Sequence, residues 1–143
     1  MERRVRNIKD GTRIDHIEPG RAIKVLFVLK CIEDGCVIIC INIESNKYNK
    51  KDFIKIENKF LEENEYNEIA LISPNATINI IKNKKRVSKE KVKIPKKIRK
   101  IGKCINPRCI TNNQNIETEF DVIDTEPIVL RCSYCESTAG YRN

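Results

Sequence analysis

Two closely spaced cysteine pairs near the C-terminus constrain the fold of this 143-residue chain more than any other feature. Four residues separate Cys104 from Cys109, two separate Cys132 from Cys135, and 22 lie between the pairs. Thiolates at such spacings can converge on one tetrahedral ion at about 2.3 Å, and two pairs leave no ligand position for water or substrate. The pattern therefore predicts one structural Zn²⁺, bound by all four side chains.

Two disulfides or an iron–sulfur cluster are the alternatives for these thiols. The chain has seven cysteines, and an odd number argues against a secreted disulfide framework. Cys31, Cys36 and Cys40 lie among apolar residues and are interpreted as small buried hydrophobes. Zinc is preferred because paired cysteine knuckles are a specific zinc signal and disulfides fit poorly with a cytoplasmic chain. Residues 104–143 are too few to bury a sufficient core and need such a staple. Metal binding supplies roughly 10–16 kcal/mol of apparent free energy toward folding such a unit.

The residues before the cysteines predict an α+β unit. Apolar runs and alternation predict a strand, helix, strand, strand, helix and strand, followed by one extra strand. This order is typical of a ferredoxin-like β-α-β-β-α-β antiparallel sheet with two helices. The expected strands are 11–17, 36–43, 50–58, 76–82 and 86–94, and the expected helices are 62–72 and 19–31, where length favours a helix over a buried strand.

The rest of the chain predicts a second, smaller domain. Segments 118–123 and 127–132 read as strands of a small all-β, ribbon-like zinc unit. Pro95 and the basic residues up to Lys103 read as a linker. We therefore expect domains at 1–95 and 96–143.

The net charge of +8 is concentrated in one segment. Twelve basic residues lie between Lys82 and Lys103, where Glu90 is the only acidic residue. Such a block is typical of a solvated strand and linker, or of a surface for nucleic acid, nucleotide phosphates or an acidic protein. No aromatic residue interleaves with it, which disfavours a stacking surface for nucleic acid.

No membrane or export signal is apparent. Apolar runs fall short of the roughly 20 residues that span a bilayer. The N-terminus MERRVRNIKDG lacks the apolar stretch of a signal peptide. We expect a cytoplasmic protein with no membrane partner.

The residues favour binding over catalysis. The chain has one histidine and no G-x-S-x-G, Walker or paired-carboxylate motif. If strands 11–17, 50–58 and 76–82 pair in one sheet, cationic and hydrogen-bonding side chains come together, as in a nucleotide site without catalysis. These residues are Asp15, His16, Lys55 and Asn79, with Lys84, Arg86 and Lys89 on the next strand.

Several segments resemble one known family. GTRIDHI at 11–17, KKDFIKIEN at 50–58, ATINII at 76–81 and the cysteine spacing followed by Glu136 resemble the regulatory chain of aspartate carbamoyltransferase. The resemblance runs in order from about Val5 to Glu136. It implies a non-catalytic chain that binds ATP and CTP on its N-terminal domain and docks on the catalytic chain through its zinc domain. Regulatory homodimers would bridge two catalytic trimers into a dodecamer of six and six chains, at the committed step of pyrimidine synthesis.

The resemblance also implies a nucleotide-binding set. His16 and Lys89 are expected at the phosphates, Asp15 at the ribose, and backbone groups near Ile8 and Lys84 at the base. The full set is Asn7, Ile8, Asp15, His16, Lys51, Lys55, Asn79, Ile81, Lys84, Arg86 and Lys89.

Three residues depart from the family pattern. Arg13 replaces a small apolar residue, and Lys84 and Arg86 replace an aromatic and an aliphatic residue. They add positive charge, so the resemblance implies no preference between ATP and CTP. A zinc-stabilised scaffold without a ligand, and a zinc-ribbon nucleic-acid-binding protein using residues 82–103, are the competing hypotheses. Candidate contacts with the catalytic chain are Asn106, Arg108 and Glu136.

Overall fold

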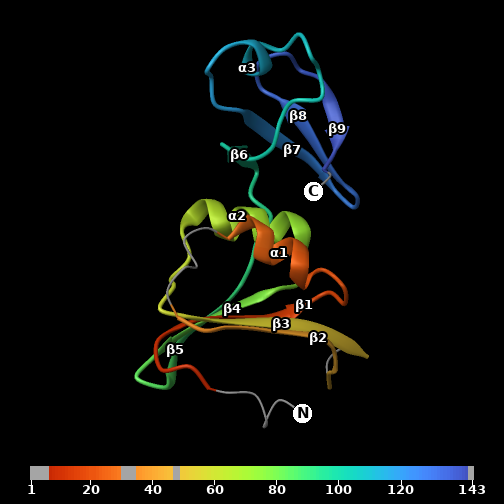
Figure 1. Cartoon of the computed structure of the whole chain (residues 1–143). Helices are drawn as coiled ribbons and strands as arrows, with labels where there is room; N and C mark the ends of the chain where they lie inside the picture. Colours follow the sequence, from red (N-terminus) through yellow and green to blue (C-terminus); the bar gives the residue numbers. More distant parts are fainter. Residues whose placement is uncertain (1–6, 30–34, 47–48, 142–143) are drawn as a thin grey trace. The chain divides into compact units, whose positions relative to one another are not determined.

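The computed structural model describes residues 7–29, 35–46 and 49–141 (Figure 1). The chain divides into two compact units, residues 1–92 and 93–143. Each unit has its own sheet, and each is described by itself.

The first unit is a five-stranded antiparallel sheet with two helices on one face (Figure 1). The strand order β2-β3-β1-β4-β5 contains the ferredoxin-like arrangement, with β5 added at one edge. The predicted order of elements is therefore confirmed. The elements are β1 (Gly11–Ile17), α1 (Ala22–Val28), β2 (Val37–Glu44), β3 (Lys50–Glu57), α2 (Glu63–Ile72), β4 (Thr77–Lys82) and β5 (Lys85–Lys91).

Alternation along the strands separates the two faces of this sheet. Ile14 on β1 and Ile54 on β3 are fully buried and pair directly across the two strands. Successive side chains of a strand point to opposite faces. Arg13 and Lys55 therefore pair on the other face, which we call the helix-free face.

A buried carboxylate connects the helical layer to the edge of the sheet. Asp52 is fully buried, and its Oδ2 atom accepts hydrogen bonds from the amides of Gly20 (2.8 Å) and Ala22 (3.1 Å) at the start of α1. Its Oδ1 atom accepts from the amide of Asn42 (2.9 Å), where β2 departs from regular pairing with β3. Asp52 thereby satisfies free amides at a helix N-terminus and at an irregular strand.

Helix α2 begins at a capping box. The Glu62 carboxylate accepts a hydrogen bond from the backbone amide of Glu65, the third residue of the helix. In return, the Glu65 carboxylate accepts a hydrogen bond from the Glu62 amide (3.0 Å). Glu65 is also buried against Lys59, whose Nζ lies 3.1 Å from Oε2. The sequence ENEYNEIALI thus starts its helix with acidic side chains, which complement the helix dipole.

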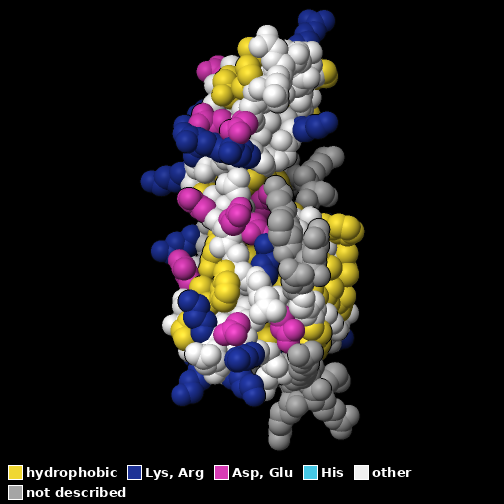
Figure 2. Space-filling model, turned by 60° about the vertical axis from the view of Figure 1, so that its left-hand side comes forward, with side chains coloured by type: hydrophobic (Ala, Val, Ile, Leu, Met, Phe, Trp, Pro, Cys, Tyr) yellow, Lys and Arg dark blue, Asp and Glu magenta, His cyan; other side chains and the backbone are white. Residues whose placement is uncertain are grey.

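The second unit is a four-stranded antiparallel sheet of order β6-β7-β8-β9. Its acidic and basic side chains lie side by side on the surface in Figure 2, and Arg99 and Lys97 of β6 pair with Glu119 of β7 at 2.7 and 3.7 Å. The small helix α3 follows the first cysteine pair. The bounds are β6 (Lys97–Arg99), α3 (Ile110–Asn113), β7 (Glu119–Thr125), β8 (Ile128–Cys132) and β9 (Thr138–Gly140).

Two expectations from the sequence are corrected. Residues 97–99 are not linker but strand β6, which pairs with β7 and buries Ile98 and Ile101 beside it. This strand was not predicted because residues 96–103 are mostly basic, and Ile98 and Ile101 are the apolar residues among them. Cys36 and Cys40 are half-buried rather than buried, since β2 is an edge strand, and Cys31 lies outside the described residues.

Candidate functional site

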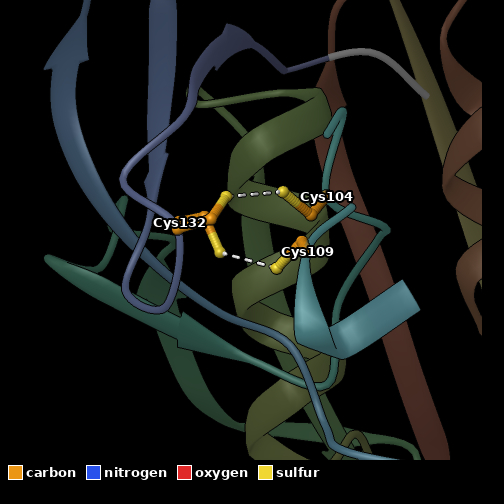
Figure 3. A group of neighbouring side chains, drawn as sticks. Cys104, Cys109 and Cys132 are labelled. Atoms are coloured by element: carbon orange, nitrogen blue, oxygen red, sulfur yellow. Dashed lines mark hydrogen bonds between the residues drawn. The ribbon is translucent and has the colours of Figure 1, made fainter. Parts of the chain in front are cut away.

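The four cysteines of the two pairs converge in the second unit, and Figure 3 shows Cys104, Cys109 and Cys132 pointing toward one another. The Sγ atoms of all four lie within 4.8 Å of one another. Cys104 Sγ is 3.4 Å from Cys135 Sγ, and Cys109 Sγ is 3.7 Å from Cys132 Sγ. All four are free cysteines, and these separations are much longer than the roughly 2.05 Å of a disulfide bond.

These distances fit one tetrahedral metal ion. Four sulfurs at 2.3 Å from a central Zn²⁺ are separated by about 3.8 Å. The spacing of the thiols is close to this value, and Cys104, Cys109 and Cys132 are buried. The cluster is therefore a closed site for a single structural metal ion such as zinc, which would join the loop before α3 to the β8–β9 turn.

Polar groups around the sulfurs shape the site. The Thr111 hydroxyl lies 3.2 Å from Cys109 Sγ, and the Ser137 hydroxyl lies 3.3 Å from Cys135 Sγ. Burial raises the pKa of the Cys104 thiol to about 12, whereas hydrogen bonding with Ser137 lowers the pKa of Cys135 to about 6. Coordination to a divalent cation deprotonates thiols, so a bound metal would bring both groups to the thiolate form.

Two asparagines on α3 hold the first cysteine loop in place. The Asn112 amide donates to the carbonyls of Cys104 (2.9 Å) and Asn106 (2.8 Å). The Asn113 amide donates to the carbonyls of Pro107 (2.9 Å) and Cys109 (2.8 Å). Sequence reasoning missed both residues, although paired amides directly after a short turn are a recognisable signal of local side-chain to backbone bonding.

The three candidate interface residues all lie beside this site. The Asn106 Oδ1 atom accepts from the Arg108 amide (3.0 Å), which closes a turn inside the first cysteine loop. The Arg108 side chain is exposed, and Glu136 is exposed in the turn after Cys135 with a φ of 64°. Asn106 therefore has a structural role in the loop, while Arg108 and Glu136 are available to a partner.

The helix-free face of the first unit gathers the predicted nucleotide residues. Arg13 on the central strand β1 pairs with Lys55 of β3 on one side and with Asn79 of β4 on the other. Asn79 in turn pairs with Lys89 of β5. Directly paired side chains share a face, so Lys55, Arg13, Asn79 and Lys89 form one row, which we call the charged row. The pairing of these strands, predicted from sequence, is confirmed.

Asp15 lies one step along β1 from this row and is held by its neighbours. Its carboxylate is 2.9 Å from Lys51 Nζ and 3.2 Å from an Arg13 guanidinium nitrogen, and it accepts from the His16 amide (2.8 Å). Burial opposes its ionisation, but the Lys51 hydrogen bond, the Arg13 charge and the His16 amide outweigh burial and lower the pKa of Asp15. Asp15 is therefore a carboxylate at neutral pH.

His16 and Phe53 complete the centre of the face. His16 has a φ of 54°, and its Nδ1 atom is 3.2 Å from the Thr77 hydroxyl of β4. The ring of Phe53 is fully buried, with the Arg13 guanidinium 4.7 Å and the Lys55 ammonium 5.6 Å from its centroid. The cations thus rest on an aromatic surface that the sequence did not assign to the site.

Asn79 carries a buried acceptor with no partner. The residue is 6% exposed, and its Oδ1 atom has no hydrogen-bond partner among the described residues. An unsatisfied buried acceptor costs about 1–3 kcal/mol, which a ligand donor could recover. Its position between Arg13 and Lys89 points to a ligand on this face.

The remaining predicted nucleotide residues lie toward the β4–β5 hairpin. The amide of Lys84, in the hairpin turn, donates to the carbonyl of Lys9 (2.8 Å), directly after buried Ile8 and exposed Asn7. Ile81 of β4 pairs with Arg86 of β5. The segment before β1 and the β4–β5 hairpin turn therefore lie together at the border of this face.

These features define a class of protein. The chain pairs a ferredoxin-like unit, whose helix-free face is lined with cations, with a small β unit built around a closed metal site, and such a site has no open position for catalysis. Within the described ranges, no helix combines the length and the apolar composition needed to span a membrane.

Comparisons with known proteins identify the family. The allosteric domain of the aspartate carbamoyltransferase regulatory chain matches residues 3–93, and the metal binding domain of the same chain matches residues 96–143. The regulatory chain of Pyrococcus abyssi is 47% identical over 140 residues, covering 96% of this chain and 92% of the relative. That of Nitrosopumilus maritimus is 50% identical over 134 residues, covering 92% and 88%. The chain belongs to the family of aspartate carbamoyltransferase regulatory chains and is a non-catalytic subunit.

Proposed function

We propose that the helix-free face binds a nucleotide effector, ATP or CTP, and that binding is transmitted to catalytic chains of aspartate carbamoyltransferase. The chain would thereby adjust the rate of pyrimidine synthesis in the cytoplasm. The observation that carries the proposal is the charged row, in which three cations flank a buried, unpartnered Asn79 acceptor.

The charges of this face suit a polyphosphate. Lys51, Lys55, Arg13 and Lys89 supply positive charge, and Asp15, paired with Lys51 and Arg13, offsets only part of it. Arginine and lysine donate charge-assisted hydrogen bonds to phosphate oxygens. His16 stands beside the same strands and offers a further donor when protonated. We assign His16 and Lys89 to the phosphates and Asp15 to a ribose hydroxyl.

One further surface of the first unit suits the proposed assembly. Ile23 and Phe27 are 44% and 82% exposed on one face of α1, and Ile41 is 44% exposed on the edge strand β2. Figure 2 shows hydrophobic side chains gathered along one flank of this unit. An exposed apolar patch beside an unpaired strand edge is typical of a subunit interface, and we assign it to the regulatory homodimer.

The metal-binding unit would dock on the catalytic chain, with Arg108 and Glu136 at the contact. In the dodecamer of six regulatory and six catalytic chains, a nucleotide shifts the balance between quaternary states only through its different affinities for them. Couplings of this kind are about 1–3 kcal/mol, or about 5- to 150-fold in affinity.

Calorimetric titration of the zinc-loaded chain with CTP, with ATP as competitor, tests the nucleotide site. We expect saturable binding that ATP displaces and that His16→Ala and Lys89→Ala weaken about tenfold each, since each removes a charge-assisted hydrogen bond. Lys24→Ala is the matched control, because Lys24 is an exposed lysine on α1, on the opposite side of the sheet. Absence of binding by the wild-type chain, or equal losses for Lys89→Ala and Lys24→Ala, would refute the site.

A further inference from the structure

Asp52 connects the two elements that carry the surface assigned to the homodimer. That surface, which we call the dimer patch, consists of Ile23 and Phe27 on α1 and Ile41 on β2. The Asp52 Oδ2 atom accepts from the amide of Ala22, directly before Ile23. Its Oδ1 atom accepts from the amide of Asn42, directly after Ile41. One fully buried side chain therefore contacts both elements of the patch.

Helix α1 depends on Asp52 for its start. The helix has only seven residues, and short helices are marginal on their own. In the described part of the chain, its N-cap residue Arg21 makes no side-chain capping bond, and its first turn holds no acidic residue. The Asp52 carboxylate takes that role from β3, with Oδ2 2.8 Å from the Gly20 amide and 3.1 Å from the Ala22 amide. The direction in which α1 presents Phe27 therefore depends on Asp52.

The shape of β2 at Ile41 depends on the same side chain. Regular pairing with β3 ends at Cys40 and resumes at Ile43, and Asn42 between them has a φ of 59°. An irregularity of this kind leaves a backbone amide without its ladder partner. The Asp52 Oδ1 atom, 2.9 Å from the Asn42 nitrogen, supplies the missing acceptor. Asp52 thereby stabilises the part of β2 that exposes Ile41.

The two edges of the sheet differ, and the difference favours β2 as the edge that meets a second copy. β2 and β5 lie at opposite edges (Figure 1). β5 has the sequence KRVSKEK, and lysines on an edge strand hinder pairing with another strand. β2 has the sequence VIICINIE, with no basic residue. An apolar edge beside exposed apolar side chains suits a two-fold contact, in which the same patch of each copy meets the other.

We propose that Asp52 is a positioning residue for the regulatory homodimer, because it keeps α1 and β2 in the arrangement that presents the dimer patch to a second copy. This inference rests on the homodimer proposed above and names the buried residue on which its surface depends. Asp52 is fully buried, so it acts on the partner through the two elements that it contacts. Its neighbour Lys51 points to the opposite side of the sheet, toward Asp15. Consecutive residues of β3 thus serve the dimer patch and the helix-free face.

Asp52→Asn tests this role most directly, because it keeps the shape of the side chain and removes one acceptor atom. Three backbone amides converge on the two carboxylate oxygens, whereas an asparagine offers one oxygen and an NH₂ group. In one orientation of the new side chain the Asn42 amide loses its acceptor, and in the other the amides of Gly20 and Ala22 lose theirs. Hydrogen exchange should therefore become faster at the start of α1 or at Asn42.

Sedimentation equilibrium of the zinc-loaded full chain measures the dimer dissociation constant. We expect Phe27→Ala, which removes an exposed side chain from the patch, to raise this constant at least about tenfold. Asp52→Asn should raise it about tenfold as well, at a temperature where circular dichroism shows that the variant is folded. Asp10→Asn is the matched control, because the Asp10 carboxylate also accepts from a backbone amide, that of Asn83 (3.0 Å), in the β4–β5 hairpin. This control should leave the dissociation constant unchanged.

A pair of substitutions at Asn42 tests the β2 half of the patch separately. Asn42 is exposed, and its φ of 59° is unfavourable for β-branched side chains but readily adopted by glycine. Both Asn42→Val and Asn42→Gly remove the asparagine side chain, and only the valine opposes the backbone conformation that Asp52 stabilises. Asn42→Val should raise the dimer dissociation constant at least about fivefold relative to Asn42→Gly.

The outcomes separate this inference from the proposed function. A wild-type chain that does not dimerise, or a Phe27→Ala variant that dimerises like wild type, would overturn the homodimer surface and this inference with it. If Phe27→Ala weakens the dimer but folded Asp52→Asn behaves like Asp10→Asn, the surface stands and the role of Asp52 is overturned. If Asp52→Asn does not fold, equal dissociation constants for Asn42→Val and Asn42→Gly overturn that role.

Discussion

Asp15 illustrates how single residues prepare the helix-free face. Its carboxylate forms ion pairs with Lys51 and Arg13 and accepts a hydrogen bond from the His16 amide. Two cations of the site are therefore held in position before any ligand binds. The side chains of Lys51 and Asp15 are only 10% and 12% exposed. Water therefore cannot replace one partner of the pair if that partner is removed. Removing one partner of a buried ion pair leaves an uncompensated charge.

Asp15→Asn should lower the free energy of unfolding of the first unit by about 3 kcal/mol at pH 7. Because the folded pKa of Asp15 is lowered, its contribution is present above the unfolded pKa of about 3.9 and is lost as pH falls through the folded value. The difference between wild type and variant in urea unfolding should therefore narrow below about pH 4. Glu44→Gln, on an exposed position of β2, is the control, and a difference that stays constant down to pH 3 would contradict the assignment.

At the scale of elements, close backbone approach determines how β1 lies between its neighbours. Gly11 begins β1 with a φ of 145°, and a Cβ atom there would overlap the carbonyl oxygen of Ile56 on β3. Gly20, before α1, also has a positive φ of 86°, but nothing lies within 4 Å of a Cβ there. Substituting each glycine in turn therefore distinguishes the cost of a positive φ from the cost of steric overlap.

Gly20→Ala should destabilise the first unit by about 1 kcal/mol, from backbone strain alone. Gly11→Ala should cost about 1–3 kcal/mol more, because β1 and β3 must also move apart. Urea unfolding of both variants measures the difference in the free energy of unfolding. Equal decreases for the two variants would mean that steric overlap with β3 adds no cost at Gly11.

At the scale of the whole molecule, the two units have different sources of stability. The first buries a core of isoleucines between its sheet and its helices. The second is about 50 residues long, and its largest fully buried side chains are Ile98 and Cys132. Small units with so little core depend on metal binding for folding.

Cys109→Ser, or removal of zinc with a chelator, should unfold the second unit and leave the first folded. Two separate unfolding transitions would then replace the wild-type profile, with the first unit still binding nucleotide. Assembly with catalytic trimers should be lost, because the unit proposed to dock is no longer folded. Cys36→Ser, at a half-buried cysteine outside the metal site, is the control, and an intact dodecamer of Cys109→Ser on size exclusion would refute the prediction.

Local patterns in the sequence determined the elements and the metal ligands. Alternation in KKDFIKIE and the β-branched run in VIICINIE predict strands β3 and β2, and two cysteine pairs predict the metal site, because these signals lie within a few residues of one another. The order of elements likewise predicted the ferredoxin-like arrangement.

Only the tertiary structure decided how distant residues meet. The row of Lys55, Arg13, Asn79 and Lys89 depends on the register of four strands, and a bulge beside Ile81 decides the face of Arg86. Strand β6 forms among basic residues because β7 pairs with it. Register is determined by contacts between residues far apart in the chain, so a pattern read along the sequence predicts which segments are strands but not which side chains stand opposite one another.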